Sequence, residues 1–186
     1  QTDQVFQCLK LISRPGSEKI VRYAFEYARR NKRKKVTCFM KDNIMKMTDG
    51  IFHEVFDVIG AEYPDIEKEA WIVDIGAAKL ADTPTAFDVI VMPNLYGDIL
   101  SDLAAGLAGS LGLAPGANFG EGTAMFEAAH GAAPDIAGKG LANPLATLLS
   151  YAMMLRYSFE LGEDADLIEG AVGDVLASGV RTRDIM

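Results

Sequence analysis

Two aspartates four residues apart could together hold a metal ion. Asp98 and Asp102 lie in the segment from Asn94 to Asp102, which follows an apolar run and leads into a predicted helix. On a helix, side chains at this spacing share one face, so the two carboxylates either repel each other or bind a cation. Oxygen ligands without a thiolate favour Mg²⁺ or Mn²⁺ over zinc. A solvated acidic face, which also suits the positive end of a helix, is the alternative.

Asp74, Lys41 and Asn43 also follow predicted strands. Asp74 opens a short predicted helix, where it binds a ligand or simply caps the helix. Lys41 and Asn43 place an ammonium close to a carboxamide at the entrance to another helix, an arrangement suited to proton relay or to holding a substrate carboxylate. The alternative is a surface lysine beside a capping asparagine. Ligands of α/β sheets gather beyond the carboxyl ends of strands, which favours the metal interpretation of Asp98 and Asp102.

A segment rich in small residues follows the last predicted strand and runs from Glu127 through His130 to Asp135. Missing side chains there let a flat ligand approach the backbone closely, although a lone histidine in such a loop is more often structural. Neither the dinucleotide fingerprint nor the P-loop fits, since Gly120-Glu121-Gly122 and Gly138-Lys139-Gly140 lack the third glycine. A nucleotide would therefore be held in a manner unlike that of Rossmann proteins.

The elements that must position these residues alternate between helix and strand. The spacing of apolar residues predicts helices at 17–30, 44–59, 74–81, from about 97, 144–161 and 164–176. Apolar runs predict strands at 8–13, 36–40, 71–73, 87–92 and 123–128. Residues 106–140 are dense in glycine and alanine, with 123–128 as their only clear strand. The alternation is typical of an α/β protein.

Composition excludes several classes of partner. With 26 acidic against 18 basic residues, no surface that tracks phosphates is evident, so we expect no nucleic acid. The longest apolar segment, Pro144 to Leu155, is too short to cross a bilayer. The basic run from Arg29 to Lys35 suits a helix end, with a nuclear signal as the weaker alternative. Cys8 and Cys38 have no companion ligands, and we expect two buried thiols in a reducing compartment.

Taken together, these segments resemble the isocitrate and isopropylmalate dehydrogenase family, in the same order along nearly the whole chain. The resemblance implies an α/β fold of the three-layer, non-Rossmann type, incomplete in this chain. It implies that Asp98 and Asp102 hold Mg²⁺ or Mn²⁺ and that Asp74 completes this metal site, also acting in catalysis, across the interface of a homodimer with shared active sites. It assigns the catalytic lysine to Lys41, which also binds substrate, and the substrate-side asparagine to Asn43.

The resemblance also implies a cofactor segment. Its predicted members are Glu127, His130, Gly131, Ala132, Ala133, Pro134, Asp135 and Asn143. Relatives that use NADP typically place Lys-Tyr after the proline, whereas this chain has Asp135-Ile136. A carboxylate there would accept hydrogen bonds from the free ribose hydroxyls and repel a 2′-phosphate, so we expect NAD.

Isocitrate, a hydroxy-tricarboxylate, is the expected substrate, because Asn43-Ile44-Met45-Lys46 is similar to the isocitrate branch. The expected reaction is oxidative decarboxylation to 2-oxoglutarate. Isopropylmalate, homoisocitrate and tartrate dehydrogenases remain alternatives, as does a non-catalytic regulatory subunit of a hetero-oligomeric isocitrate dehydrogenase. A truncated domain without a function of its own is the third hypothesis.

Two domains are expected, one formed in part by about residues 1–85 and the other by about residues 86–186. The first would belong to the small dimerisation domain and the second to the C-terminal part of the large nucleotide-binding domain. The N-terminal part of the enzyme is expected to be absent from this chain, which alone should neither fold fully nor turn over. A bacterial cytoplasm or a mitochondrial matrix suits the protein equally.

Overall fold

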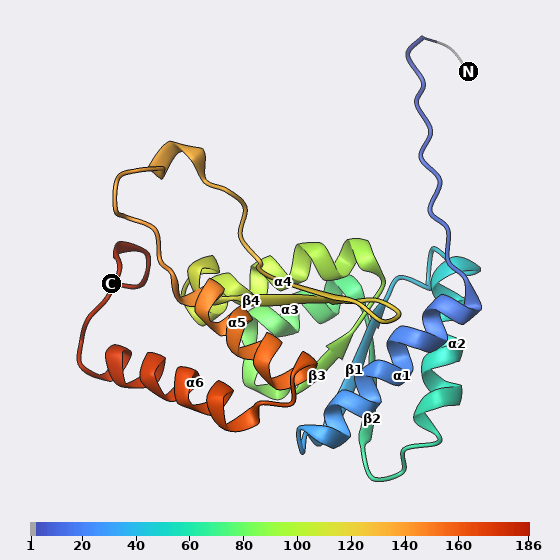
Figure 1. Ribbon diagram of the computed structural model, residues 1–186. Helices are drawn as coiled ribbons and strands as arrows, with labels where there is room; N and C mark the ends of the chain where they lie inside the picture. Colours follow the sequence, from blue (N-terminus) through green and yellow to red (C-terminus); the bar gives the residue numbers. More distant parts are fainter. Residues whose placement is uncertain (1–2) are drawn as a thin grey trace. The chain divides into compact units, whose positions relative to one another are not determined.

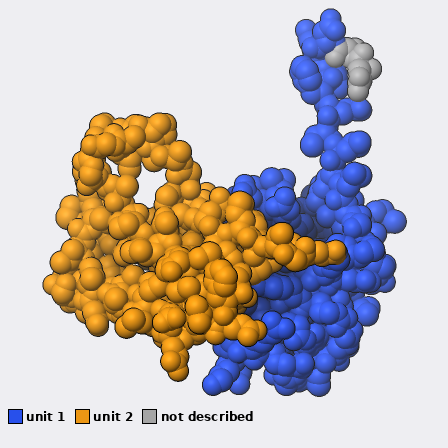
Figure 2. Space-filling model, viewed as in Figure 1, with its two compact units in different colours: residues 1–101 blue, residues 102–186 orange. Residues whose placement is uncertain are grey.

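The computed structural model describes residues 3–186 and divides into two compact units. The units comprise residues 1–101 and residues 102–186, drawn in blue and orange in Figure 2. The prediction of two enzyme domains that meet near residue 85 stays a prediction.

The first unit is built on a parallel sheet of three strands in the order β2-β1-β3. The strands are β1 (Lys35–Met40), β2 (Glu67–Ile72) and β3 (Val89–Val91). Parallel strands need long crossovers, and the helices α2 (Thr48–Gly60) and α3 (Val73–Asp82) supply them. The predicted α/β class is therefore confirmed.

Side chains of β1 alternate between the two faces of this sheet. Val36, Cys38 and Met40 join the apolar core shared with α1 (Arg14–Arg30) and α2, which lie side by side in Figure 1. Phe39 points to the opposite face, where Gly76 of α3 lies so close to its ring that an added Cβ would meet it at 2.9 Å. The sheet is thus the middle of three layers, because helices cover both of its faces.

The second unit is a hairpin packed on two helices. Its strands β4 (Pro115–Phe119) and β5 (Ala124–Ala128) are antiparallel, and α5 (Leu145–Ser158) packs on both. Ser150 of α5 contacts both strands of the hairpin. Its Oγ accepts from the Gly116 N–H at 3.2 Å and donates to the Glu127 carbonyl oxygen at 2.9 Å. The helix α6 (Gly162–Ala177) packs against α5.

The remaining helix, α4 (Asn94–Ala108), follows β3 and crosses the division between the units. Short 3₁₀ turns complete the chain at Pro84–Ala86 (η1), Leu111–Leu113 (η2), Pro134–Ile136 (η3) and Arg183–Ile185 (η4). Within residues 3–186, no helix is both long enough and apolar enough to span a membrane.

Most predicted elements are confirmed within a few residues, and four expectations are wrong. The run 8–13 is not a strand, because no described strand pairs with it. The helix expected from 44 begins at Thr48, since the Lys41 carbonyl first accepts from the N–H groups of Ile44 and Met45 in a turn. Strand β4 was not expected, because its proline, glycine and asparagine disfavour strands. Cys8 is exposed, whereas Cys38 is buried as predicted.

Candidate active site

Three of the predicted site residues lie at the carboxyl edge of the parallel sheet. Lys41 directly follows β1, Asp74 lies in the first turn of α3 after β2, and Asp98 lies in α4 after β3. Because the strands run parallel in the order β2-β1-β3, these chain segments leave neighbouring strands at the same edge. This is the position at which α/β sheets build their sites.

Lys41 and Asp74 form an ion pair at this edge. The Lys41 Nζ lies 2.9 Å from Asp74 Oδ1, and the side chains are 23% and 68% exposed. The hydrogen bond from Lys41 is the main cause of a lowered pKa for the Asp74 carboxyl. Asp74 is therefore a carboxylate at neutral pH, and its exposed oxygens can still reach a further partner.

Asp98 and Asp102 lie one turn apart on α4, and both are exposed. Neither side chain makes a hydrogen bond or ion pair with any residue of the described range 3–186. Two like charges at this spacing, with no cationic side chain between them, fit a divalent cation with oxygen ligands. Within residues 3–186 of one chain, no group of three His, Cys, Asp or Glu residues is arranged so that it could hold a metal.

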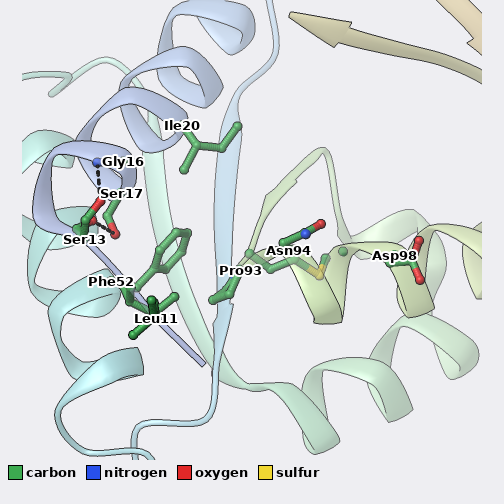
Figure 3. A pocket seen from close by; sticks show the side chains of 12 residues that line it. Leu11, Ser13, Gly16, Ser17, Ile20, Phe52, Pro93, Asn94 and Asp98 are labelled. Atoms are coloured by element: carbon green, nitrogen blue, oxygen red, sulfur yellow. Dashed lines mark hydrogen bonds between the residues drawn. The ribbon is translucent and has the colours of Figure 1, made fainter. Parts of the chain in front are cut away.

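A hollow of about 510 Å³ lies beside Asp98 in the first unit. Figure 3 shows Asn94 and Asp98 on one side and Ser13 with the start of α1 on the other. Phe52 and Pro93 lie between them, so much of the lining is apolar. The first turn of α4 therefore borders an open space in which a ligand of Asp98 could sit.

Asn43 is exposed in the turn between β1 and α2. It lies two residues beyond Lys41, but no described contact ties its side chain to that lysine. Its assignment to the substrate side therefore stays a prediction.

The predicted cofactor segment lies in the second unit and is exposed over most of its length. Residues 129–135 are all exposed, and Ala133 has a left-handed backbone with φ of 43°. The His130 ring lies against its own loop, with Nδ1 2.9 Å from the Gly131 carbonyl oxygen. Glu127, on β5, accepts a hydrogen bond from Asn118 at 3.1 Å. The segment presents backbone and small side chains to solvent, as a surface for a flat ligand requires.

Asn143, the last predicted cofactor residue, is buried instead. Its Oδ1 accepts from the Leu145 N–H at 3.0 Å, and its Nδ2 donates to Asp184 at 3.0 Å. Ser110 donates to the same Asp184 oxygen at 2.5 Å. Partial burial alone would raise the pKa of Asp184, but hydrogen bonds, that from Ser110 first, outweigh it and lower the pKa to about 2. The geometry of Asn143 thus depends on Asp184, a residue that the sequence did not single out.

Three more polar residues near Lys41 were missed. Asp49 is fully buried and contacts both Lys10 and the backbone of Lys41, and Lys10 also contacts Tyr96. An acidic residue in the first turn of a helix is common enough to hide such a role. One signal could have identified Asp49, because it is a charged residue at a position where the helix spacing predicts a buried side chain.

A family model described as isocitrate/isopropylmalate dehydrogenase matches residues 1–186. The chain belongs to the isocitrate/isopropylmalate dehydrogenase family. The resemblance expected from the aspartate pair and the strand-end residues is therefore confirmed.

Relatives in the family carry different names. The chain is 58% identical to the NADP isocitrate dehydrogenase of Rickettsia typhi, matching 100% of this chain and 38% of that protein. It is 50% identical to the 3-isopropylmalate dehydrogenase of Archaeoglobus fulgidus, matching 97% of this chain and 55% of that protein. It is 49% identical to subunit 2 of the mitochondrial NAD isocitrate dehydrogenase of Schizosaccharomyces pombe, over 97% of this chain and 48% of that protein.

Solved structures confirm the family fold. The chain matches the TT0538 protein of Thermus thermophilus at 54% identity with a TM-score of 0.96, over 100% of this chain and 37% of that one. It matches isocitrate dehydrogenase of Methylococcus capsulatus at 51% identity with a TM-score of 0.93, over 96% of this chain and 53% of that one. This member of the family therefore spans between 37% and 55% of the length of these relatives.

Proposed function

We propose that the full-length protein oxidatively decarboxylates isocitrate to 2-oxoglutarate, using NAD and Mg²⁺ or Mn²⁺. The observation that carries this proposal is the row of Lys41, Asp74 and Asp98 along one sheet edge in a chain of this family. Dehydrogenation next to a carboxylate needs a proton acceptor and an electrophile for the forming carbonyl oxygen. Lys41 would relay the proton, and the carboxylates would hold the divalent cation that acts as the electrophile.

The metal site is proposed to be shared between two copies of the chain. Asp98 and Asp102 would provide two carboxylates, and Asp74 of a second copy would provide the third. Apolar side chains at helical spacing on α4 support a homodimer, since all four are exposed in one chain: Leu95, Ile99, Leu103 and Leu107. A bound divalent cation would polarise the substrate hydroxyl and the carbonyl formed from it, and would stabilise the enolate left by loss of CO₂.

Each protein side chain has a separate task in this proposal. Lys41 would relay the proton that leaves the substrate hydroxyl, in the site of the neighbouring copy. Asp74 holds the ammonium of Lys41 at 2.9 Å and so limits the positions that it can take. Asn43 would donate to an oxygen of the substrate, because a carboxamide can bind a carboxylate without adding charge.

NAD is proposed as the cofactor, held by the exposed segment from His130 to Asp135 together with Glu127 and Asn143. Asp135 lies in η3, directly after a proline, and it is exposed. A carboxylate there accepts from ribose hydroxyls and repels a 2′-phosphate. The Rickettsia relatives are named NADP enzymes, so this residue is where the proposal is most easily overturned.

Isocitrate is preferred over isopropylmalate because relatives named isocitrate dehydrogenase reach 58% identity and Asn43-Ile44-Met45-Lys46 follows that branch. Homoisocitrate and tartrate are the further alternative acids. The second candidate function is that of a regulatory subunit, which we consider because one relative at 49% identity is named as subunit 2 of an NAD isocitrate dehydrogenase. A cytoplasmic location, or a mitochondrial matrix, is proposed with either function.

A steady-state assay of the full-length protein tests these proposals together. Four acids, isocitrate, isopropylmalate, homoisocitrate and tartrate, are each assayed with NAD and with NADP in the presence of Mg²⁺ or Mn²⁺. We expect the highest kcat/KM with isocitrate and NAD, and loss of turnover when EDTA removes the metal. Preference for another acid or for NADP would overturn that part of the proposal. No turnover of any acid by the full-length chain alone would favour the regulatory subunit.

A further inference from the structure

Asp49 is a buried carboxylate that the proposed mechanism does not use. It lies in the first turn of α2, eight residues beyond Lys41, and its side chain has no exposed surface. A buried charge is costly unless it is paired and hydrogen-bonded, so the partners of Asp49 indicate why it is there.

One oxygen of Asp49 fixes the backbone of the catalytic lysine. Asp49 Oδ2 accepts from the Lys41 N–H at 2.8 Å, at the point where β1 ends. The ammonium at the other end of Lys41 is held by Asp74 at 2.9 Å. Lys41 is therefore fixed at both ends, each time by a carboxylate.

The other oxygen of Asp49 connects this turn to α4. Asp49 Oδ1 lies 2.5 Å from the ammonium of Lys10, which is 24% exposed. That ammonium lies 3.3 Å from the hydroxyl of Tyr96 and 4.6 Å from the centroid of its ring. Tyr96 is two residues before Asp98 in the first turn of α4. Contacts thus run from the Lys41 turn, through Asp49 and Lys10, to the first turn of α4, which directly precedes the proposed metal ligand Asp98.

We propose that Asp49 is a positioning residue, which sets Lys41 through its backbone N–H and holds the Lys41 turn against the first turn of α4 through Lys10. The inference rests on the proposed function, because it assigns Asp49 to the reaction that Lys41 serves. It differs from a role in folding alone, in which Asp49 would only neutralise Lys10 and favour the start of α2.

Two variants of the full-length enzyme separate these roles. Asp49→Asn keeps the shape of the side chain but replaces one acceptor oxygen by an amide donor, so Lys10 and the Lys41 N–H can no longer both be accepted. Lys10→Met keeps the bond to Lys41 but leaves the buried carboxylate without its cation, which is the more destabilising change. If Asp49 positions Lys41, Asp49→Asn should therefore lose more kcat, and Lys10→Met should lose more thermal stability.

For Asp49→Asn we expect kcat with isocitrate to fall about 10- to 100-fold, the range typical of residues that orient a reacting group. KM is expected to stay within about twofold, because no substrate-binding side chain is removed. The deuterium isotope effect on kcat, measured with isocitrate labelled at the transferred hydride, should depart from the wild-type value. Lys10→Met should lose less kcat and more Tm.

Glu54→Gln is the matched control, because Glu54 lies on α2 like Asp49. The change removes only an exposed ion pair with Arg14 at 2.9 Å. It should leave kcat, KM and the isotope effect unchanged. If Asp49→Asn does not fold, Asp49→Glu retains the charge beside Lys10 but displaces the carboxylate from the Lys41 N–H. The proposal expects Asp49→Glu to have a lowered kcat even where its thermal unfolding shows that it is fully folded at the assay temperature.

Losses of kcat that follow the losses of Tm in both variants, with an unchanged isotope effect, would overturn the inference. So would wild-type kcat in Asp49→Asn or, where that variant does not fold, in Asp49→Glu. A wild-type enzyme that fails to oxidise isocitrate is a different result, because it rejects the proposed function before any variant is compared.

Discussion

The edge of the parallel sheet and the cofactor segment differ in how their residues are held. At the sheet edge, Lys41 bonds to Asp49 at one end and to Asp74 at the other. In the second unit, residues 129–135 are all exposed, and the His130 ring contacts the carbonyl oxygen of the neighbouring Gly131. Proton transfer and metal binding need side chains fixed to within about half an ångström. A cofactor that is exchanged at every turnover needs an open surface, so the difference is consistent with the two proposed tasks.

The difference also predicts where single substitutions act. A change at the sheet edge removes a charged group of the proposed reaction site, so we expect it to lower turnover. A change in the exposed segment leaves the fold intact and alters which cofactor is accepted.

The largest effect is expected at the proposed metal site. Asp102→Asn in the full-length enzyme removes a ligand charge, and we expect turnover to fall by about 10⁴-fold or more, since metal-based stabilisation of the forming charge amounts to several kcal/mol. Asp174→Asn, which removes an acidic residue from α6, is the control. Near-normal turnover by Asp102→Asn across a range of Mn²⁺ concentrations would refute the metal site.

The exposed segment should change specificity rather than rate. Asp135→Lys combined with Ile136→Tyr replaces a repulsive carboxylate by a cation. The ratio of kcat/KM for NADP over NAD should rise about 100-fold, which corresponds to roughly 2.7 kcal/mol. Steady-state kinetics with both cofactors measure this ratio. An unchanged ratio would mean that Asp135 does not distinguish the free ribose hydroxyl of NAD from the 2′-phosphate of NADP.

Substitutions at two glycines compare packing at the sheet with packing in the exposed cofactor segment. Gly76→Ala places a methyl group 2.9 Å from the Phe39 ring, and we expect a loss of about 1–3 kcal/mol from overpacking, reduced by the better helix propensity of alanine. Gly131→Ala has no described atom within 4 Å of its new methyl group and should leave Tm unchanged. Thermal unfolding of the two full-length variants measures both. Equal Tm shifts would contradict the contrast between the regions.

The smallest expected effect is the acid titration of Asp184. Its folded pKa of about 2 lies below the ordinary value of 3.8, so its stabilising contribution is present above pH about 4 and is lost as pH falls through about 2. Carbon NMR of the labelled carboxyl in the full-length protein follows this titration. Ser110→Ala should raise the midpoint, because it removes the hydrogen bond at 2.5 Å. A midpoint at or above 3.8 in the unmodified protein would contradict the contacts with Ser110 and Asn143.

The sequence was informative where local patterns determine the structure. Apolar runs followed by polar residues identified the ends of β1, β2 and β3, and with them Lys41, Asp74 and Asp98. Helical spacing of apolar residues identified most of the helices to within a few residues. These patterns involve residues that are close together in the sequence, so a single sequence is enough to recognise them.

The sequence was uninformative where distant residues decide. Asp49 and Lys10 are 39 residues apart and Asn143 and Asp184 are 41 apart, so no local pattern pairs them. Strand β4 contains proline, glycine and asparagine, and its pairing with β5 and its packing on α5 outweigh those propensities. The exposed run 8–13 shows the converse, since an apolar pattern without a pairing strand does not make a strand.

Complementation between two inactive variants tests the shared metal site most directly. Asp102→Asn and Asp74→Asn full-length chains are each expected to be inactive as homodimers, and they are mixed under conditions that exchange subunits. If Asp74 serves the site of the other copy, each mixed dimer contains one intact site, and the mixture should recover about a quarter of wild-type activity. Activity no greater than the sum of the two separate variants would contradict a site shared between two chains.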